Sequence, residues 1–463
     1  MTWVSSRSGE LPRMLELIPS FVTILFGVGA LGLALRDYMR REQGLIIGAF
    51  ALHLVAALAQ VFITRDVYGY GDMLTYFHES AFVADRMRED FLAYAPDALR
   101  LLFQQQTTHF AWLDESSPAT ATMYGLSAWL HYLTQGSLYA TCLLIAIGAF
   151  FGKLAMYRAF RPLFPSHLHQ RMIAGMMWMP SIVFWSSGLL KESVAMIGLG
   201  LATYGIIRLA DSTSSTPRAA LAIGAGSVIV GLVKTYILGP FAIAAGAWYY
   251  WQRGLRLSGG QALSLRPLHF ALAMALAMTA IIGLGALFPR YALTNLVDEA
   301  SRLQEVGQSI SGGSNFALSD TAPTSSSGQL AMAPLAVITA LARPFLFEAN
   351  NIMALVSALE MTFILGLVFL ALYRRGGREC WQVIMRSPPL VFALIFVVLF
   401  ALGVGLTTTN MGTLARYRMP MLPFYMMLLF ALLPARAPRQ PVRLRRQRLN
   451  ARRESPLPGP HRS

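Results

Sequence analysis

Apolar runs, each about as long as a bilayer is thick, recur along nearly the whole sequence. A helix needs roughly 20 consecutive apolar residues to cross the hydrocarbon core of a membrane. Only 13% of the residues are charged, whereas soluble globular proteins carry about 25%. No long polar stretch remains that could build a separate soluble domain. The sequence therefore predicts an all-α fold, a polytopic transmembrane helical bundle.

We expect about eleven spanning helices, followed by an Arg- and Pro-rich tail over 436–463 that is disordered and cytoplasmic. Residues 1–435 then form a single integral membrane domain. The predicted spans are 18–35, 44–64, 137–158, 172–187, 189–208, 219–234, 236–252, 268–289, 351–373, 388–407 and 415–434. Two shorter apolar stretches, 119–133 and 332–346, are expected to be re-entrant or interfacial half-helices.

The net charge of +15 comes largely from Arg residues in short connections and in the tail. One such connection holds Lys153, Arg158, Arg161 and Arg171. Under this helix count all the basic connections fall on one side of the membrane, which the positive-inside rule assigns to the cytoplasm. The N-terminus is then outside and the C-terminus inside. The basic excess is explained without a nucleic acid partner.

Two long loops, about 65–136 and 290–350, are expected on the opposite, extracytoplasmic side. The first is acidic in balance, and the stretch from Met73 to about Gln104 is typical of an amphipathic helix. Its predicted apolar contacts are Phe77, Phe82, Met87, Phe91 and Leu92. The only cysteines, Cys142 and Cys380, lie in opposite halves of the chain, so no disulfide framework is predicted.

Asp72 stands just beyond the second predicted helix, among Tyr68, Tyr76 and His78. A carboxylate at the rim of a membrane helix can act as a general base or bind a divalent cation, and aromatic rings suit stacking on a sugar. The structural alternative is that Asp72 begins the amphipathic helix, a position where Asp is favoured, while the tyrosines belong to the interfacial aromatic belt.

Lys191 and Glu192 follow a Pro- and Gly-containing break, Pro180 to Gly188, at the outer tip of a hydrophobic hairpin. Ions in or near a membrane are costly and often mark functional sites. Lys191 can bind a phosphate or diphosphate as a point charge, and Lys234 lies at the next outer helix tip. The alternative is a turn in which Lys191 snorkels to water and Glu192 neutralises it.

Two further segments combine basic and amide side chains at outer helix ends. Arg343 and Glu348 precede a predicted helix that contains Glu360, a rare acid in the middle of a helix; the alternative is an internal Arg–Glu pair. Asn410, Arg416 and Arg418 form the other segment. These arginines violate the positive-inside trend and suit bidentate binding of phosphate or carboxylate, with interfacial snorkelling as the alternative.

Taken together, the Gly71-Asp72…Tyr76, Phe184-Trp185…Gly188…Lys191-Glu192, Arg343-Pro344-Phe345…Glu348 and Asn410…Arg416-Tyr417-Arg418 segments resemble polytopic glycosyltransferases of the GT-C type. They also resemble the repeat-unit polymerases of bacterial exopolysaccharide clusters. GT-C enzymes carry a catalytic acid in their first outer loop, and Asp72 matches that position. It differs by following the second helix and by not being part of a paired acidic motif.

The resemblance implies transfer of a sugar or oligosaccharide from a polyprenyl-phosphate-linked donor in the bacterial inner membrane, with Asp72 as catalytic base. The bilayer, the lipid-linked saccharide and other polysaccharide assembly proteins are the implied partners. No organic cofactor is expected, and a divalent cation stays open, with Asp72 as its ligand. The implied substrate-binding residues are Tyr68, Tyr76, His78, Lys191, Glu192, Lys234, Arg343, Glu348, Asn410, Arg416 and Arg418.

Three alternatives stay open. A repeat-unit polymerase or ligase would depend on outer-face arginines more than on one acid. A transporter of lipid-linked saccharides would carry charges near the bilayer midplane and internal repeats. A non-catalytic assembly component would tolerate alanine at the polar motifs. The sequence contains no Walker A, HExxH or Gly-x-Ser-x-Gly motif, which leaves ATP-driven, zinc-protease and serine-hydrolase functions without support.

Overall fold

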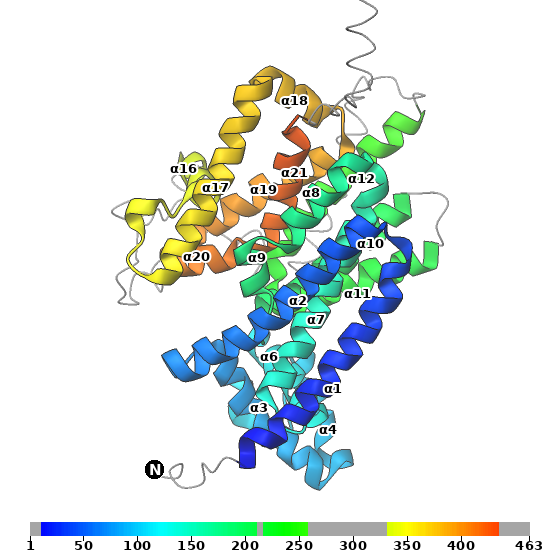
Figure 1. The fold of residues 1–463 in the computed structure, drawn as a ribbon. Helices are drawn as coiled ribbons and strands as arrows, with labels where there is room; N and C mark the ends of the chain where they lie inside the picture. Colours follow the sequence, from blue (N-terminus) through cyan, green and yellow to red (C-terminus); the bar gives the residue numbers. More distant parts are fainter. Residues whose placement is uncertain (1–10, 211–215, 258–330, 435–463) are drawn as a thin grey trace, which may run out of the picture. The chain divides into compact units, whose positions relative to one another are not determined.

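The computed structural model describes residues 11–210, 216–257 and 331–434. Within these ranges the chain forms helices joined by short turns, with no strand (Figure 1). The all-α prediction is therefore confirmed for the described part. The predicted span 268–289, most of the second long loop and the tail 436–463 lie outside it.

Seven helical segments in the described ranges are long and apolar enough to cross a membrane, which makes the chain a multi-pass membrane protein in character. They are Glu16–Asp37, Arg40–Tyr68, Leu138–Leu163, Lys191–Leu209, Pro217–Gln252, Ile352–Arg375 and Pro388–Thr407. The helices within them are α1 (Leu11–Ala34), α2 (Arg40–Phe62), α7 (Leu138–Phe160), α10 (Lys191–Ala210), α11 (Thr216–Lys234), α12 (Leu238–Leu257), α17 (Ile352–Arg375) and α19 (Pro388–Thr407). The count of about eleven stays a prediction.

Two of the predicted spans are interrupted in the structure. Over 172–187 the chain forms α8 (Ser166–Met177) and α9 (Pro180–Trp185). Pro180 stands at the start of α9, where a missing backbone N–H is tolerated. Over 415–434 it forms α20 (Met411–Tyr417), η8 (Met419–Met421) and α21 (Leu422–Leu432). Pro420 and Pro423 fall at the starts of η8 and α21. These breaks put backbone turns beside the polar motifs.

The core is built by close pairwise packing of helices around α7, α10 and α19. Helix α10 packs along both α7 and α11, while α19 packs against α12 and α16 (Ala333–Ala342) (Figure 1). Glycine allows the closest of these approaches, since a Cβ on Gly200 would overlap the backbone of Gly152 across the α7–α10 contact. Small residues at helix crossings are typical of membrane bundles, because lipid supplies no hydrophobic drive for helix association.

The loop 65–136 is mostly helical. It begins with η2 (Ile63–Tyr68) and continues as α3 (Asp72–Glu89), α4 (Phe91–Leu102), α5 (Ala111–Asp114) and α6 (Pro118–Leu133). The amphipathic helix predicted over Met73–Gln104 is present as α3 and α4. Asp90 separates the two by accepting a hydrogen bond from the Ala93 N–H, which caps α4. Both helices pack on α6 (Figure 1).

The predicted apolar contacts of this loop are only partly present. Phe77 and Met87 are buried, but Phe82, Phe91 and Leu92 are exposed. Phe82 instead meets Trp112 with its ring edge, and Phe91 meets Trp129 in the same way. Phe82 and Phe91 thus make apolar contacts at the surface of the loop, whereas the prediction was wrong for Leu92, which lies just beyond the break at Asp90 and is 85% exposed.

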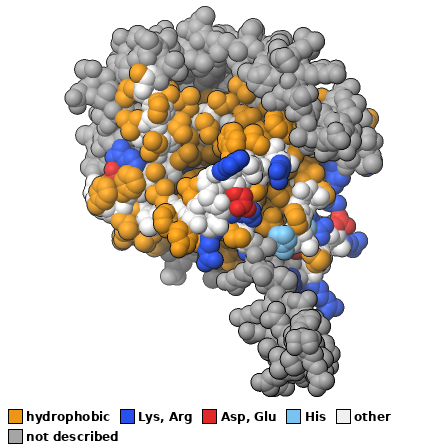
Figure 2. Space-filling model, turned by 90° about the horizontal axis from the view of Figure 1, so that it is seen from above, with side chains coloured by type: hydrophobic (Ala, Val, Ile, Leu, Met, Phe, Trp, Pro, Cys, Tyr) orange, Lys and Arg blue, Asp and Glu red, His pale blue; other side chains and the backbone are white. Residues whose placement is uncertain are grey.

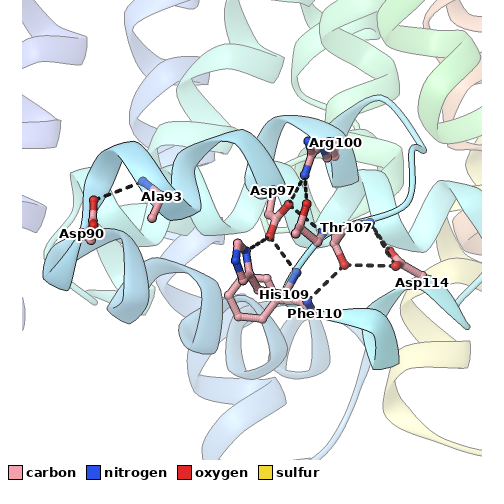
Figure 3. Close-up of polar contacts among 9 residues, drawn as sticks. Asp90, Ala93, Asp97, Arg100, Thr107, His109, Phe110 and Asp114 are labelled. Carbon is pink, nitrogen blue, oxygen red and sulfur yellow. Dashed lines mark hydrogen bonds and ion pairs between the residues drawn. The ribbon is translucent and has the colours of Figure 1, made fainter.

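A buried carboxylate ties the turn between α4 and α5 (Figure 3). Asp97 accepts hydrogen bonds from Arg100 Nη1 at 2.8 Å, from the Thr108 N–H at 2.9 Å and from the His109 N–H at 3.0 Å. The His109 ring nitrogen Nδ1 lies 2.8 Å from the same side chain. Asp114 accepts from both the N–H and the hydroxyl of Thr107. All these hydrogen bonds and contacts join residues of the loop 65–136 to one another.

Glu42, near the start of α2, is fully buried and hydrogen-bonded at both oxygens. Oε1 accepts from the Tyr157 hydroxyl at 3.0 Å and lies 2.8 Å from His169 Nδ1. Arg161 Nη2 donates to Oε2 at 2.9 Å, and the Met39 N–H donates to the same oxygen at 3.1 Å. The cluster fixes α2, α7, α8 and η3 (Arg161–Leu163) to one another.

Lys153 does not belong to a basic connection, so that prediction was wrong. It lies inside α7 and is fully buried. Its Nζ is 2.7 Å from His53 Nε2 and also contacts the Ser186 hydroxyl. The Nδ1 of His53 is 2.6 Å from the Ala49 carbonyl oxygen.

Viewed from above, the molecule shows basic side chains scattered over a mainly apolar face, with few acidic ones (Figure 2).

Candidate functional site

Four charged side chains from distant parts of the sequence meet at one place. Glu192, the second residue of α10, is fully buried. Its Oε1 lies 2.8 Å from Lys234 Nζ, at the end of α11, and 2.9 Å from Arg416 Nε, in α20. Arg416 Nη1 lies 2.7 Å from Asp72 Oδ2, at the start of α3. We call Asp72, Glu192, Lys234 and Arg416 the charge cluster.

The cluster is buried on one side and open on the other. The side chains of Glu192 and Lys234 are 0% and 5% exposed, that of Arg416 is 20% exposed, and that of Asp72 is 48% exposed. Exposure thus rises along the chain of ion pairs from Glu192 through Arg416 to Asp72. Burying charges is tolerated only when they are paired, which explains why the two innermost cations share one carboxylate oxygen.

Aromatic rings and hydroxyls surround Lys234. Its Nζ donates to the Tyr236 hydroxyl at 2.9 Å and lies 4.1 Å from the centre of the Tyr417 ring. Cation–π contacts of this kind stabilise a desolvated ammonium. Tyr417 follows Arg416 directly in the sequence, so one short helix supplies both the guanidinium and the ring.

Lys191 lies beside the cluster and is partly buried. Its Nζ donates to the Thr120 hydroxyl at 2.9 Å and lies 5.8 Å from the centre of the Tyr76 ring. Among the described residues no carboxylate oxygen lies within 4.0 Å of it. Burial raises the pKa of Tyr76, and the nearby Asp72 carboxylate raises it further. Tyr76 is therefore a neutral hydrogen-bonding phenol at physiological pH.

Local sequence explains how these side chains are presented. Gly71 adopts φ of +142°, which disfavours any side chain, and so lets the chain turn sharply into α3 with Asp72 as its first residue. Asn410 caps α20 by accepting from the Gly412 N–H at 2.9 Å and the Thr413 N–H at 3.3 Å. A Cβ on Gly188 would overlap the Gln60 side chain, so glycine lets the chain entering α10 lie against α2.

The structure brings together six of the predicted site residues: Asp72, Tyr76, Lys191, Glu192, Lys234 and Arg416. Tyr68 and His78 lie nearby in sequence but make other contacts. Tyr68 is exposed, with its ring centre 6.3 Å from that of Tyr70. His78 is also exposed, and its ring lies against Phe77.

Arg343, Glu348 and Arg418 belong to a second polar group. Arg343 Nε donates to Glu348 Oε1 at 2.9 Å, as the alternative of an internal ion pair predicted. Arg418 is fully buried; it donates to the Arg343 carbonyl oxygen and, at 2.9 Å, to the Ser357 hydroxyl. Glu360, one turn of α17 beyond Ser357, accepts from the Ser181 N–H at 3.1 Å. Arg418 thus braces α17 against α20.

Sequence reasoning missed Thr120 as a partner of Lys191, since nothing in a lone threonine marks it. It also missed the buried Lys153–His53–Ser186 contact, although Lys153 sits within a predicted helix and that position was the available signal.

No group of three or more His, Cys, Asp or Glu side chains suited to a metal ion occurs in the part of the chain that the structure describes. Both cysteines are buried and free.

At the open side of the charge cluster the Arg416 guanidinium contacts the exposed Asp72 carboxylate, and guanidinium groups bind anions such as carboxylate and phosphate. Comparison with known proteins gave no match: no family model matches the chain, and no curated protein and no solved structure matches it.

Proposed function

We propose that the protein is a membrane glycosyltransferase of the GT-C type that transfers a sugar or oligosaccharide from a polyprenyl-phosphate-linked donor. The observation that carries the proposal is the 2.7 Å ion pair between Asp72 and Arg416. It joins the residue predicted to act as base to a residue predicted to bind the lipid phosphate. Lys191 also lies beside the ring of Tyr76, whose pKa is raised mainly by burial and further by the Asp72 carboxylate.

In the proposed reaction Asp72 takes the proton of the acceptor hydroxyl, and the hydroxyl oxygen attacks the anomeric carbon of the donor. The bond from that carbon to the phosphate oxygen breaks, and the polyprenyl phosphate leaves with the bonding electrons. Arg416 and Lys191 stabilise the negative charge that develops on the leaving oxygen. Inversion at the anomeric carbon follows from a single displacement.

The proposal includes the topology predicted from the basic connections. The charge cluster then faces the extracytoplasmic side of a bacterial inner membrane, with about eleven spans, the N-terminus outside and the C-terminus inside. Partner proteins of polysaccharide assembly would supply the lipid-linked substrate and receive the product. Arg343, Glu348 and Arg418 act in this scheme by holding α20 in place, because their contacts lie between α17 and the turn that follows α16.

Our first prediction concerns Asp72→Asn, which removes the base but keeps the shape of the side chain. We expect at least a 100-fold loss of transfer, within the range of general-base effects. The assay supplies lipid-linked saccharide to purified protein in proteoliposomes and measures release of polyprenyl phosphate. Asp66→Asn, at a similarly exposed carboxylate paired with Arg65, is the control. Undiminished transfer by Asp72→Asn would remove Asp72 as base. If Arg416→Gln and Arg343→Gln abolish transfer while Asp72→Asn does not, a polymerase or ligase is favoured.

A transporter of lipid-linked saccharides is a second candidate, favoured by one observation. Lys153 and His53 are buried within helices α7 and α2, both long and apolar enough to cross a membrane. Ionisable groups at such depth often mark a proton or substrate path. Proton flux or lipid scrambling by the purified protein, lost in Lys153→Met, would support transport. A transferase without transport activity shows no flux in either protein.

A further inference from the structure

Two carboxylates contact Arg416, and they differ in their exposure to solvent. Glu192 holds its Nε from the buried side, with no exposure of its own, while Asp72 holds Nη1 from the open side with a side chain that is 48% exposed. An exposed ion pair contributes little to stability because water and salt screen it. The inner contact therefore fixes the guanidinium, and the outer contact is the one that an incoming ligand can replace.

The charges around Arg416 do not balance. Lys191, Lys234 and Arg416 are cationic, whereas Glu192 and Asp72 are the only carboxylates that contact them within the described residues. Lys191 satisfies its ammonium with a neutral hydroxyl and a ring face instead. The surplus positive charge is that of Lys191, which interacts electrostatically with both Asp72 and Arg416.

We infer that the Asp72 carboxylate occupies a binding site for a phosphate or diphosphate group, formed by Arg416 Nη1 and Lys191. The anion displaces Asp72 from Arg416, and the freed carboxylate then becomes available as the base. This inference rests on the proposed function for the second step only. A phosphoryl group competes well because its several oxygens can bridge Arg416 Nη1 and Lys191 at once, whereas the Asp72 carboxylate contacts Arg416 alone.

The inference gives the contact between Arg416 and the proposed base a role. The Asp72 oxygen that contacts Arg416 Nη1 cannot take the proton of an acceptor hydroxyl until that contact is broken. Because Asp72 leaves Arg416 only when the phosphate arrives, Asp72 can act as a base only in the substrate-bound protein. Lys234 and Glu192 stay in place throughout, because they are buried and paired with each other.

The test measures binding, not turnover, on the full chain in lipid nanodiscs. Two probes are titrated separately: inorganic pyrophosphate, and a polyprenyl diphosphate incorporated in the bilayer. Removing the competing carboxylate in Asp72→Asn should tighten binding roughly 2- to 10-fold, by freeing a binding-competent site. Lys191→Met should weaken binding by about 10-fold or more. Asp66→Asn and Arg86→Met, at exposed ion pairs outside the cluster, should leave both affinities unchanged.

Unchanged or weaker binding in Asp72→Asn with both probes overturns the displacement model. Unchanged binding in Lys191→Met overturns the assignment of Lys191. Tightening with both probes supports a site that needs only the phosphate group, whereas tightening with the polyprenyl probe alone supports a site that takes the lipid. Glycan transfer is not needed for any of these outcomes, so a failed proposal of transferase activity and a failed anion site give different results.

Discussion

Glu42 and Glu192 are both fully buried glutamates near the first turn of a long helix, yet they are used differently. Both oxygens of Glu42 accept hydrogen bonds, from Tyr157, Arg161 and the Met39 backbone. In Glu192 two cations converge on Oε1, and Oε2 has no hydrogen-bond partner among the described residues. A saturated buried carboxylate ties helices together, whereas the unsaturated Glu192 carboxylate holds two cations in position at one oxygen.

The largest predicted effect concerns Glu42, the carboxylate whose two oxygens both accept hydrogen bonds. Glu42→Gln leaves Arg161 without its counterion and mismatches a donor amide to the Tyr157 and His169 contacts. We expect a loss of about 3–5 kcal/mol in the free energy of unfolding, as for other broken buried ion pairs. Titration with denaturing detergent in mixed micelles measures it.

Glu192→Gln should lose a similar amount, about 3–5 kcal/mol, because it leaves the buried Lys234 without a carboxylate, although Arg416 keeps Asp72. Glu379→Gln, at an exposed helical ion pair, is the control for both and should change stability little. A loss for Glu192→Gln no larger than that for Glu379→Gln would contradict the pairing of Glu192 with Lys234 and Arg416.

A further prediction concerns Gly188, where the chain enters α10 just before Glu192. Gly188→Ala places a Cβ on the Gln60 side chain, and overpacking of this kind costs typically 1–3 kcal/mol. In the double variant Gln60→Ala/Gly188→Ala the Gln60 side chain is shortened, so most of the lost free energy of unfolding should be restored. The double variant should then bind the anion as the wild type does. Additive losses in the double variant would mean that the two residues are not in contact.

The smallest predicted effect concerns Asp97, a buried carboxylate that is satisfied like Glu42 but lies in the loop. Burial alone would raise its pKa, but hydrogen bonds from the Thr108 N–H, His109 and Arg100 outweigh burial and lower the pKa. Because the pKa of Asp97 is lower in the folded than in the unfolded protein, its carboxylate stabilises the loop at pH above the unfolded pKa of about 4. This stabilisation is lost as the pH falls through the folded pKa.

Amide hydrogen exchange in the α4–α5 turn should therefore accelerate in acid for the wild type. In Asp97→Asn exchange should be fast already at neutral pH and change less with acidification. Asp85→Asn, at an exposed pair with Arg88, should retain the wild-type acid response. An acid response that survives in Asp97→Asn would assign it to another group.

The sequence predicted the members of the charge cluster better than their arrangement. Charged residues at helix tips in an apolar chain are conspicuous, and Asp72, Glu192, Lys234 and Arg416 stood out for that reason. Arg418 was grouped with Arg416, but residues two apart on a helix point in nearly opposite directions. The structure accordingly has Arg416 facing Glu192 and Arg418 facing Ser357.

Lys153 shows a second reason why the sequence was insufficient. Its charge suggested a basic connection, although the apolar residues on both sides belong to one helix, α7. Only the packing of α2 on α7 and of α9 on α2 places His53 and Ser186 beside it. Likewise, the exposure of Leu92 follows from Asp90, which caps a new helix, α4, with Leu92 as its second residue.

The central claim, that distant charged residues form one cluster, is tested most directly by a double-mutant cycle between Glu192 and Arg416. The free energy of unfolding is measured for wild type, Glu192→Gln, Arg416→Gln and the double variant. Direct contact predicts an interaction energy of about 0.5–3 kcal/mol, well above that of the exposed Arg375–Glu379 pair. Losses that add within about 0.3 kcal/mol would contradict the cluster.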